Sequence, residues 1–297
     1  MRLRGAAPVN LIATTDGLAR IDGTEAALLD LPFDDVAALL ATGDGFAPAH
    51  TAAVRRRIPL ADLDGKLLAP LAATGAVWGV GLNYHCKARL TGRPVPPDPI
   101  VFLKARSAMP APDADVVLPL DRIGQPDYEG EVAVVVGRRM QDTPADEVWQ
   151  HIAGITAAND MTARDAMAAT GNPTLAKSFA GFGALGASVL DLTAVPDPAD
   201  IPVETLVNGA VRQSSSTASL IFDVPELLAR LTRFVVLQPG DVVLTGTPAG
   251  TGQDRDDFLR PGDQVEVRVG GVLPLRTRFV ARDGGTPADP GPSDPRS

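Results

Sequence analysis

The sequence predicts an α+β protein in which short β-strands outnumber helices. Three observations indicate this class. Short apolar runs of strand length recur along most of the chain. Turn-forming Pro-Gly-Asp triplets at 239–241 and 261–263 stand directly before two of these runs. Few segments show the spacing of apolar residues that a helix requires. We therefore expect a β-rich barrel or sandwich rather than a doubly wound parallel sheet.

Residues 1–70 are expected to form a small N-terminal domain. The apolar stretches 9–14 and 18–21 flank Asp16-Gly17, a pair typical of a hairpin turn. Residues 34–41 then predict a short helix with an acidic residue near its start. The segment 63–70 would lead into the main domain.

Residues 71–282 are expected to form the main domain, and residues 283–297 a disordered tail. The tail is indicated by its content of Gly, Pro, Asp and Ser. Within the main domain, helical segments are expected at 145–151 and 223–234. Strands are expected at 77–82, 100–104, 128–136, 152–158, 185–190, 203–207, 242–245 and 265–269.

Composition narrows the classes of function. The net charge of −9 argues against nucleic acid as a partner, because polyanion binding requires a basic surface. No run reaches the roughly 18 to 20 apolar residues that span a bilayer, and the first residues lack the apolar run of a signal peptide. We therefore expect a cytoplasmic protein without membrane contact. Cys86 is the only cysteine, which excludes an internal disulfide or a cysteine zinc cluster.

The clearest chemical signal is the pair of carboxylates at Glu129 and Glu131. Side chains two apart on a strand point to the same face, so these two would stand side by side. Burying two like charges is costly unless a cation lies between them, and hard divalent cations prefer carboxylate oxygens. Asp160 follows another apolar run and offers a third ligand. The alternative is a solvated acidic stripe on an exposed strand.

Other residues allow chemistry but admit simpler roles. The chain has four lysines, Lys66, Lys87, Lys104 and Lys177, among many arginines. Lys177 lies beside a glycine-rich segment and would be either an electrophile next to a substrate oxygen or a surface lysine. Arg164 would hold a substrate carboxylate or pair with Asp165. The small-residue loop 244–252 would cradle an anion through its backbone N–H groups or serve as a plain connection.

Taken together, these segments resemble the fumarylacetoacetate hydrolase family over about residues 75–281. The likeness rests on several motifs in a fixed order, which is more specific than any one of them. The motifs are Gly81-Leu82-Asn83-Tyr84, Val101-Phe102-Leu103-Lys104, Asp127-Tyr128-Glu129-Gly130-Glu131, residues 159–165, Lys177-Ser178-Phe179, Val207-Asn208-Gly209 with Gln213, and residues 239–248.

The resemblance implies a mixed β-sandwich roll, usually a homodimer. It also implies Mg²⁺ or Mn²⁺ held by three carboxylates at Glu129, Glu131 and Asp160. The family's substrates are 2-oxo or 1,3-dicarbonyl acids, whose adjacent oxygens bind the metal so that an enolate is stabilised. The matching positions imply catalytic roles for Lys177 and Arg164. They imply substrate contacts for the following residues: Tyr84, Lys104, Gln213 and Thr247.

One motif departs from the family. Many hydrolytic members carry Asn-Tyr-x-x-His-Ala-x-Glu, in which His and Glu activate water. Here Lys87 stands at the His position and Leu90 at the Glu position. Leucine transfers no proton, and a charged lysine is a poor base at neutral pH. We hypothesise that Lys87 acts as the base if burial lowers its pKa. Pro residues usual near the lysine motif are replaced by Ala184 and Ala187, and a family glutamine by Met167.

Three functions follow from these observations. The first is a Mg²⁺-dependent enzyme acting on a small 2-oxo acid or 1,3-dicarbonyl compound by C–C hydrolysis, decarboxylation or tautomerisation. The second is a non-hydrolytic isomerase or cyclase of a specialised pathway, since Leu90 and Met167 suit a larger, more apolar substrate. The third is a metal-binding protein without turnover. The retained lysine and carboxylates favour the two enzymes over the third.

Overall fold

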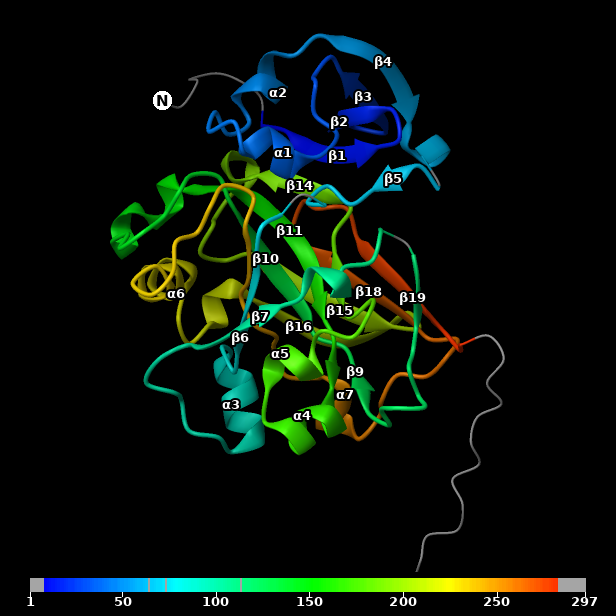
Figure 1. The fold of residues 1–297 in the computed structure, drawn as a ribbon, viewed down its shortest axis with the longest axis vertical. Helices are drawn as coiled ribbons and strands as arrows, with labels where there is room; N and C mark the ends of the chain where they lie inside the picture. The colour runs from blue at the N-terminus through cyan, green and yellow to red at the C-terminus, as the bar shows by residue number, and fades with distance from the viewer. Residues whose placement is uncertain (1–7, 64, 73, 113, 283–297) are drawn as a thin grey trace, which may run out of the picture.

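A computed structural model describes residues 8–282, apart from 64, 73 and 113. Within them, a large mixed sheet packs against a smaller one, and short helices lie around both (Figure 1). Among the described residues, the strands do not close into a barrel. The predicted α+β, strand-rich class is therefore confirmed, and of the two expected architectures the sandwich is the correct one. The predicted tail, 283–297, lies outside the described residues.

The large sheet has twelve strands among the described residues. Its main order is β4-β3-β2-β1-β14-β11-β10-β17-β6-β7, with β5 paired to β1 and β13 paired to β11. The strands are β1 (Asn10–Thr14), β2 (Gly17–Asp22), β3 (Glu25–Leu29), β4 (Val54–Pro59), β5 (Leu67–Leu68), β6 (Val77–Gly81), β7 (Ile100–Lys104), β10 (Gly130–Val136), β11 (Ile152–Asp160), β13 (Gly183–Leu185), β14 (Ser188–Asp191) and β17 (Val242–Leu244).

The smaller sheet has the order β16-β15-β18-β19-β8, and a separate two-stranded ladder joins β12 to β9. Their bounds are β8 (Asp115–Val117), β9 (Pro126–Asp127), β12 (Thr162–Ala163), β15 (Pro202–Val207), β16 (Ala210–Ser216), β18 (Gln264–Val269) and β19 (Leu275–Val280). The two sheets approach closely at β10, where a Cβ on Gly130 would lie 1.8 Å from Thr205 Oγ1 on β15. Glycine is therefore required at that position.

The helices are short, and none in the described part of the chain is long and apolar enough to cross a bilayer. Four of them, α3, α4, α5 and α7, gather at the end of the molecule opposite the N-terminal strands (Figure 1). The α-helices are α1 (Val36–Leu40), α2 (Ala47–Thr51), α3 (His85–Thr91), α4 (Arg164–Thr170), α5 (Pro173–Ala176), α6 (Val224–Leu231) and α7 (Gly252–Arg255). The 3₁₀ helices are η1 (Leu60–Leu63), η2 (Arg106–Ala108), η3 (Ala145–Gln150), η4 (Leu192–Ala194) and η5 (Thr217–Ser219).

Strand β10 forms the centre of the core because both of its faces are buried. Val132, Val134 and Val136 face the smaller sheet, in one apolar cluster with residues of β15, β18 and β19. Ala133 and Val135 face the other side, in a second cluster that includes residues of β1 and α1. The unbroken apolar run after Glu131 predicted this burial on both faces.

The N-terminal strands extend the large sheet instead of forming a separate one. β1 pairs antiparallel with β14, with Asn10 opposite Leu190 and Ile12 opposite Ser188. Helix α1 begins after Asp35, whose side chain accepts a hydrogen bond from the Ala38 N–H, as the acidic start predicted. The division of the chain at residue 70 stays a prediction.

Candidate metal centre

Two neighbouring strands bring three carboxylates together. Glu131 lies on β10, Glu129 directly precedes that strand, and Asp160 is the last residue of β11. β10 and β11 are antiparallel, with Gly130 opposite Asn159 and Glu131 opposite Ala158. The Asp160 N–H also donates to the Glu129 carbonyl, at 2.8 Å. This register places the end of β11 beside the start of β10, although the two segments are some thirty residues apart.

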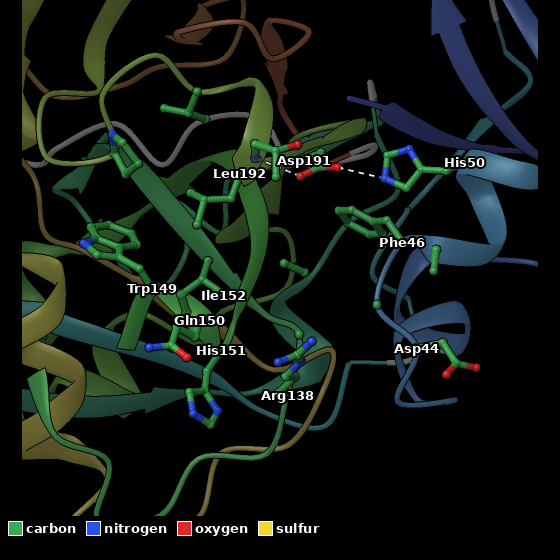
Figure 2. Close-up of a pocket in the computed structure, with 17 residues that line it drawn as sticks. Asp44, Phe46, His50, Arg138, Trp149, Gln150, His151, Ile152, Asp191 and Leu192 are labelled. Atoms are coloured by element: carbon green, nitrogen blue, oxygen red, sulfur yellow. Dashed lines mark hydrogen bonds and ion pairs between the residues drawn. The ribbon is translucent and has the colours of Figure 1, made fainter. Parts of the chain in front are cut away.

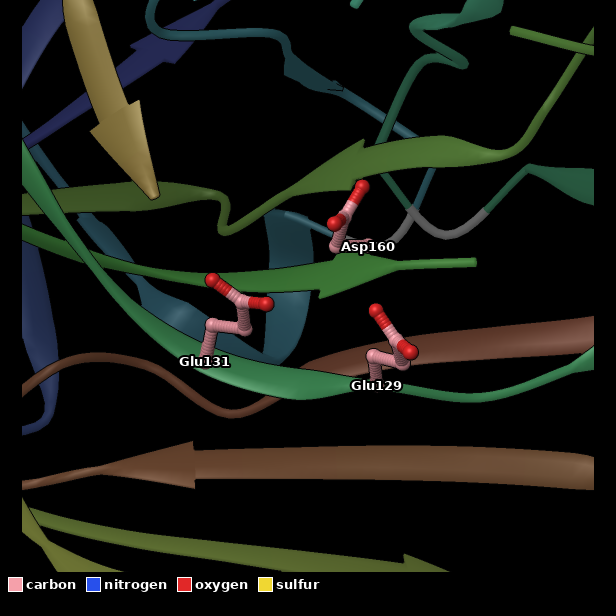
Figure 3. A group of neighbouring side chains, drawn as sticks. All are labelled: Glu129, Glu131 and Asp160. Carbon is pink, nitrogen blue, oxygen red and sulfur yellow. The ribbon is translucent and has the colours of Figure 1, made fainter. Parts of the chain in front are cut away.

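The three carboxylate groups lie on one side of these strands (Figure 3). Each offers an oxygen, and the three oxygens lie within 4.8 Å of one another. The three residues are almost entirely buried, with relative exposures of 5%, 1% and 1% for Glu129, Glu131 and Asp160. An all-oxygen, buried donor set suits a hard divalent cation rather than a soft one. The residues present therefore fit the metal site that the sequence predicted.

Two lysines meet the same carboxylates. Lys177 Nζ contacts Glu129 Oε2, and lies 2.6 Å from Asp160 Oδ2. Lys104 Nζ, from β7, lies 2.5 Å from Asp160 Oδ1. Lys177 also stands over the Phe102 ring, 5.1 Å from its centroid. Both ammonium groups are buried, so their charges act on the carboxylates with little screening by water.

Arg164 links Glu129 to a fourth carboxylate. It pairs with Glu129 Oε1, and its Nε donates to Asp127 Oδ2 at 2.7 Å. Asp127 is fully buried and also accepts from the backbone N–H groups of Gly252 and Gln253, at 2.6 and 3.0 Å. Asp127 therefore connects the start of α7 to Arg164, and through it to a predicted metal ligand.

The surroundings shift the pKa values of Glu129 and Glu131 in opposite directions. Burial opposes the ionisation of Glu129, but the charges of Arg164 and Lys177 outweigh it and hold the pKa of that carboxyl at about 2. Burial raises the pKa of Glu131 well above its usual range, and the charges of Asp160 and Glu129 raise it further. Glu131 is thus the carboxylate whose ionised form most needs another positive charge nearby.

The pKa values of Lys104 and Lys177 are also shifted in opposite directions. Burial is the largest influence on both. The pKa of Lys104 is lowered because burial exceeds the attraction of Asp160. The pKa of Lys177 is raised because Asp160 and Glu129 together outweigh burial. The contacts of Lys177 with two predicted metal ligands therefore favour its ammonium form.

The comparisons with known proteins agree with this geometry. The family model described as "Fumarylacetoacetate (FAA) hydrolase C-terminal" matches residues 76–280. The chain belongs to the fumarylacetoacetate hydrolase family. The sequence resemblance is thereby confirmed, as is the fold of the mixed, sheet-rich type that this family shares. Membership makes the protein an enzyme of a family whose named members include hydrolases, isomerases and tautomerases.

Three relatives illustrate the range of the family. Protein Rv2993c of Mycobacterium tuberculosis is 37% identical over 280 residues, which are 93% of this chain and 98% of that protein. The human mitochondrial oxaloacetate tautomerase FAHD2A is 39% identical over 208 residues, 68% of this chain and 65% of that protein. A crystal structure of 5-carboxymethyl-2-hydroxymuconate delta-isomerase from Mycobacterium smegmatis has a TM-score of 0.74 at 32% identity, covering 93% and 100% of the two chains.

Lys87, at the position of the family histidine, is engaged elsewhere. Its Nζ lies 2.7 Å from both carboxylate oxygens of Asp254 on α7 and 2.8 Å from Thr251 Oγ1. A carboxylate partner stabilises the ammonium form, which has no lone pair to accept a proton. Leu90, at the position of the family glutamate, is 59% exposed on α3. The structure therefore offers no support for the hypothesis that Lys87 is a base.

The remaining predicted substrate residues of the family lie around the carboxylates. The Tyr84 hydroxyl is buried and finds no hydrogen-bond partner among the described residues. Burial, aided by the charge of Glu131, raises the pKa of Tyr84. Gln213 donates to Thr247 Oγ1 and accepts from the Gly130 N–H, at 2.8 and 3.0 Å. These contacts brace the start of β10, and the substrate roles of Tyr84, Gln213, Thr247 and Lys104 stay predictions.

Two polar residues of the site were missed from the sequence. Asp127 was quoted only as the start of a motif, and its place before Glu129 gave no sign of its contacts with α7. Asp254 stands in an acidic, loop-like stretch and had no signal at all. In the structure it closes a capping box with Thr251 at the start of α7. Asp127 and Asp254 each bond to a cationic side chain more than 30 positions away in sequence. Motif spacing does not reveal such long-range contacts.

A cavity of about 810 Å³ lies at the opposite end of β10 and β11 (Figure 2). It is lined by Phe46 and His50 from the N-terminal region, by Arg138 just after β10, and by Trp149 on η3. His50 lies 3.1 Å from Asp191 across it. Its lining residues include none of those predicted for the site.

Proposed function

We propose that this protein is a Mg²⁺- or Mn²⁺-dependent enzyme that tautomerises or isomerises a 2-oxo acid or 1,3-dicarbonyl substrate. The observation that carries the proposal is the buried group of Glu129, Glu131 and Asp160 beside Lys177. These three carboxylates would hold the cation. When bound, the cation would act as a Lewis acid toward adjacent substrate oxygens and favour the enolate.

The balance of charge supports an anionic substrate. With every group counted at its formal charge, the described side chains of the cluster comprise four carboxylates and three cations, which leaves one negative charge. A divalent cation would reverse the sign of that balance. Its positive excess would then favour a substrate carboxylate or an enolate. The groups counted are Asp127, Glu129, Glu131, Asp160, Lys104, Arg164 and Lys177.

The residues of the chain suggest how a proton is handled. Lys177 holds a proton at Nζ between Glu129 and Asp160, where it would stabilise a developing oxyanion or protonate an enolate. We propose that the unpartnered hydroxyl of Tyr84 hydrogen-bonds to the substrate, together with Lys104 and Thr247. Gln213 would act beside them by holding Thr247 in place.

Tautomerisation or isomerisation is favoured over C–C hydrolysis for a specific reason. Hydrolysis needs a base that activates water, and the family's His and Glu are replaced by an ion-paired Lys87 and an exposed Leu90. A keto–enol shift moves a proton within the substrate and needs no activated water. The names of two relatives, an oxaloacetate tautomerase and a 5-carboxymethyl-2-hydroxymuconate isomerase, point in the same direction.

The experiment follows the enol-to-keto conversion of oxaloacetate by ultraviolet absorbance, with Mg²⁺, with EDTA, and after Mg²⁺ is restored. Pyruvate is measured in the same samples, and an acylpyruvate is tested in parallel. We expect enol loss that depends on metal, without pyruvate release. Metal-dependent pyruvate release would assign decarboxylation instead, and acylpyruvate cleavage would assign hydrolysis. Turnover that survives EDTA would contradict metal dependence.

We also propose that the enzyme is a cytoplasmic homodimer. The resemblance to the family motivates the dimer, and the edge strand β7 exposes two apolar side chains, Ile100 and Leu103. Light scattering coupled to size exclusion tests the dimer, and a mass of one chain would contradict it. Cell fractionation tests the location.

A further inference from the structure

We propose that Lys87 and Asp254 form a positioning pair that fixes the loop 245–251 against the metal ligands. In this role Lys87 is a buried tether between α3 and α7, and it does not accept a proton from the substrate. This inference rests on the proposed function only where it is tested by enzyme turnover. Two other measurements below are independent of turnover.

The first step is the geometry of the pair. Asp254 Oδ2 accepts from Lys87 Nζ at 2.7 Å and from the N–H groups of Gly250 and Thr251 at 2.8 and 3.1 Å. Lys87 Nζ also donates to Thr251 Oγ1. The side chains of Lys87 and Asp254 are only 9% and 4% exposed. A buried ion pair with this many hydrogen bonds is held in one arrangement, and removing either partner leaves the other charge uncompensated.

The second step connects the loop to the metal centre. At its start, the Gly246 N–H donates to Glu131 Oε2 at 2.7 Å. Thr247 Oγ1 donates to the Gly130 carbonyl at 3.0 Å, between the two glutamates. At its end, the Gly250 carbonyl accepts from the Tyr128 hydroxyl at 2.8 Å. The loop thus contacts Glu131 and Gly130 of β10 near its start and Tyr128, two residues before β10, at its end, where Asp254 also holds it.

The third step is the backbone that the pair must hold. Gly246 and Gly250 have φ values of +101° and +111°, a region that other residues rarely adopt. Glycine has more backbone conformations in the unfolded chain than other residues, so ordering this short loop costs more conformational entropy. Gln213 and Gly130 hold the middle of the loop, and the Asp254 carboxylate with its lysine holds the end. Glu131 would then depend on this pair for its orientation.

A second carboxylate acts in the same way on the next residues. Asp127 accepts from the N–H groups of Gly252 and Gln253 and pairs with Arg164, which contacts Glu129. The segment 250–253 is therefore held by two buried carboxylates, each neutralised by a cation from a different helix, α3 or α4. Lys87 supplies the cation on the α3 side, and an ammonium suits that place better than a neutral imidazole would.

The test compares Lys87→Met, Lys87→Arg, Asp254→Asn and the double variant Lys87→Met/Asp254→Asn. Lys66→Met is the matched control, because the Lys66 side chain is exposed and donates to the Asp62 carbonyl, away from the carboxylates. Mn²⁺ affinity is measured by calorimetry, amide exchange of 246–251 in metal-free protein by mass spectrometry, and oxaloacetate turnover by absorbance. Thermal unfolding confirms that each variant is folded before these measurements.

We expect Lys87→Met and Asp254→Asn to weaken Mn²⁺ binding and kcat/KM alike, by about 10- to 100-fold. The double variant should lose no more than either single variant, because the two changes remove the same connection. Amide hydrogen exchange of residues 246–251 should be faster than in the wild type in both of these single variants and in the double variant. Lys87→Arg should restore most of the loss, since arginine keeps the charge and cannot act as a base at neutral pH.

The opposite pattern would overturn the proposal. If Lys87 were a base, Asp254→Asn would free its amine and preserve or increase turnover, while Lys87→Met and Lys87→Arg would both abolish it. Unchanged exchange and Mn²⁺ affinity in Asp254→Asn would also refute a positioning role. A wild-type enzyme that turns over no oxo acid would remove the proposed function alone, since exchange and metal affinity would still decide the role of the pair.

Discussion

At the scale of single residues, Glu131 carries the largest conflict between stability and function. It is buried among like charges, which raises its pKa. We therefore expect Glu131→Gln to raise the melting temperature of the metal-free protein, by roughly 2 °C for each kcal/mol of relieved repulsion. The same change should abolish Mn²⁺ binding and turnover, because an amide is a weaker ligand for a hard cation.

Differential scanning calorimetry and Mn²⁺ titration measure the two effects of Glu131→Gln. Glu147→Gln serves as the control, because Glu147 is exposed and lies outside the site. Its melting temperature and metal affinity should match the wild type. A Glu131→Gln variant that melts lower and still binds Mn²⁺ would show that this carboxylate is structural.

Lys177 should separate metal affinity from catalysis. Its ammonium contacts oxygens of both Glu129 and Asp160, so it competes with a cation for the same charges. In Lys177→Met we expect the Kd for Mn²⁺ to fall about tenfold, equivalent to ~1.4 kcal/mol. We expect kcat to fall by about 10²- to 10⁴-fold, because the proton carrier is lost. Calorimetry and the oxaloacetate assay measure the two quantities. Weaker metal binding with normal kcat would contradict this assignment.

At the scale of secondary-structure elements, the sequence located β10 and β11 because long apolar runs mark buried strands. It also placed Asp160 at a strand end. It did not show that Glu129 lies just outside β10, since a strand boundary depends on the partner's hydrogen bonds. The expected helix at 145–151 is the 3₁₀ helix η3, and the expected strand at 185–190 is divided between β13 and β14.

Side-chain contacts between distant secondary-structure elements could not be predicted from the sequence. Motif spacing identified Glu129, Glu131, Asp160 and Lys177 because the family keeps them in order. Nothing in the spacing joined Lys87 to Asp254, because that contact arises only when α3 and α7 fold onto the same end of the molecule. The lysine could therefore be read as a base from the sequence, whereas its partner becomes visible only in three dimensions.

The connection between α3 and α7 should show in the pH dependence of stability. Burial opposes ionisation of Asp254, but the bonds from Lys87, Gly250 and Thr251 outweigh it and lower its pKa. A lowered pKa means that the stability from this carboxylate is present above its ordinary pKa of about 3.8 and is lost as the pH falls further. Charged hydrogen bonds of this kind contribute about 1.5–3 kcal/mol.

We therefore expect Asp254→Asn to lower the free energy of unfolding by about that amount near neutral pH. The difference from the wild type should shrink as the pH falls below about 4, because the wild-type carboxylate becomes protonated. Urea unfolding at several pH values measures it in metal-free protein. A difference that grows on acidification would contradict the sign of this pKa shift.

At the scale of the whole molecule, the N-terminal strands belong to the same sheet and share a core with β10, which carries the predicted ligand Glu131. Leu11, Leu39 and Leu40 are fully buried in one cluster with Val135 and Leu244. Burying each such leucine contributes about 1.5–3 kcal/mol. Removal of residues 1–70 would expose this cluster and the edge of β14, which pairs with β1.

We therefore expect the fragment 71–297 to aggregate or to unfold without a cooperative transition, although the three predicted metal ligands lie within it. Size exclusion and thermal unfolding by circular dichroism test this, and the chain truncated after residue 282 is the control. The control should retain the melting temperature of the full chain, because the described core ends before the removed segment. A monodisperse fragment 71–297 that melts cooperatively would instead establish residues 1–70 as a separate domain. Its Mn²⁺ affinity would then show whether the N-terminal strands contribute to the metal centre at the far ends of β10 and β11.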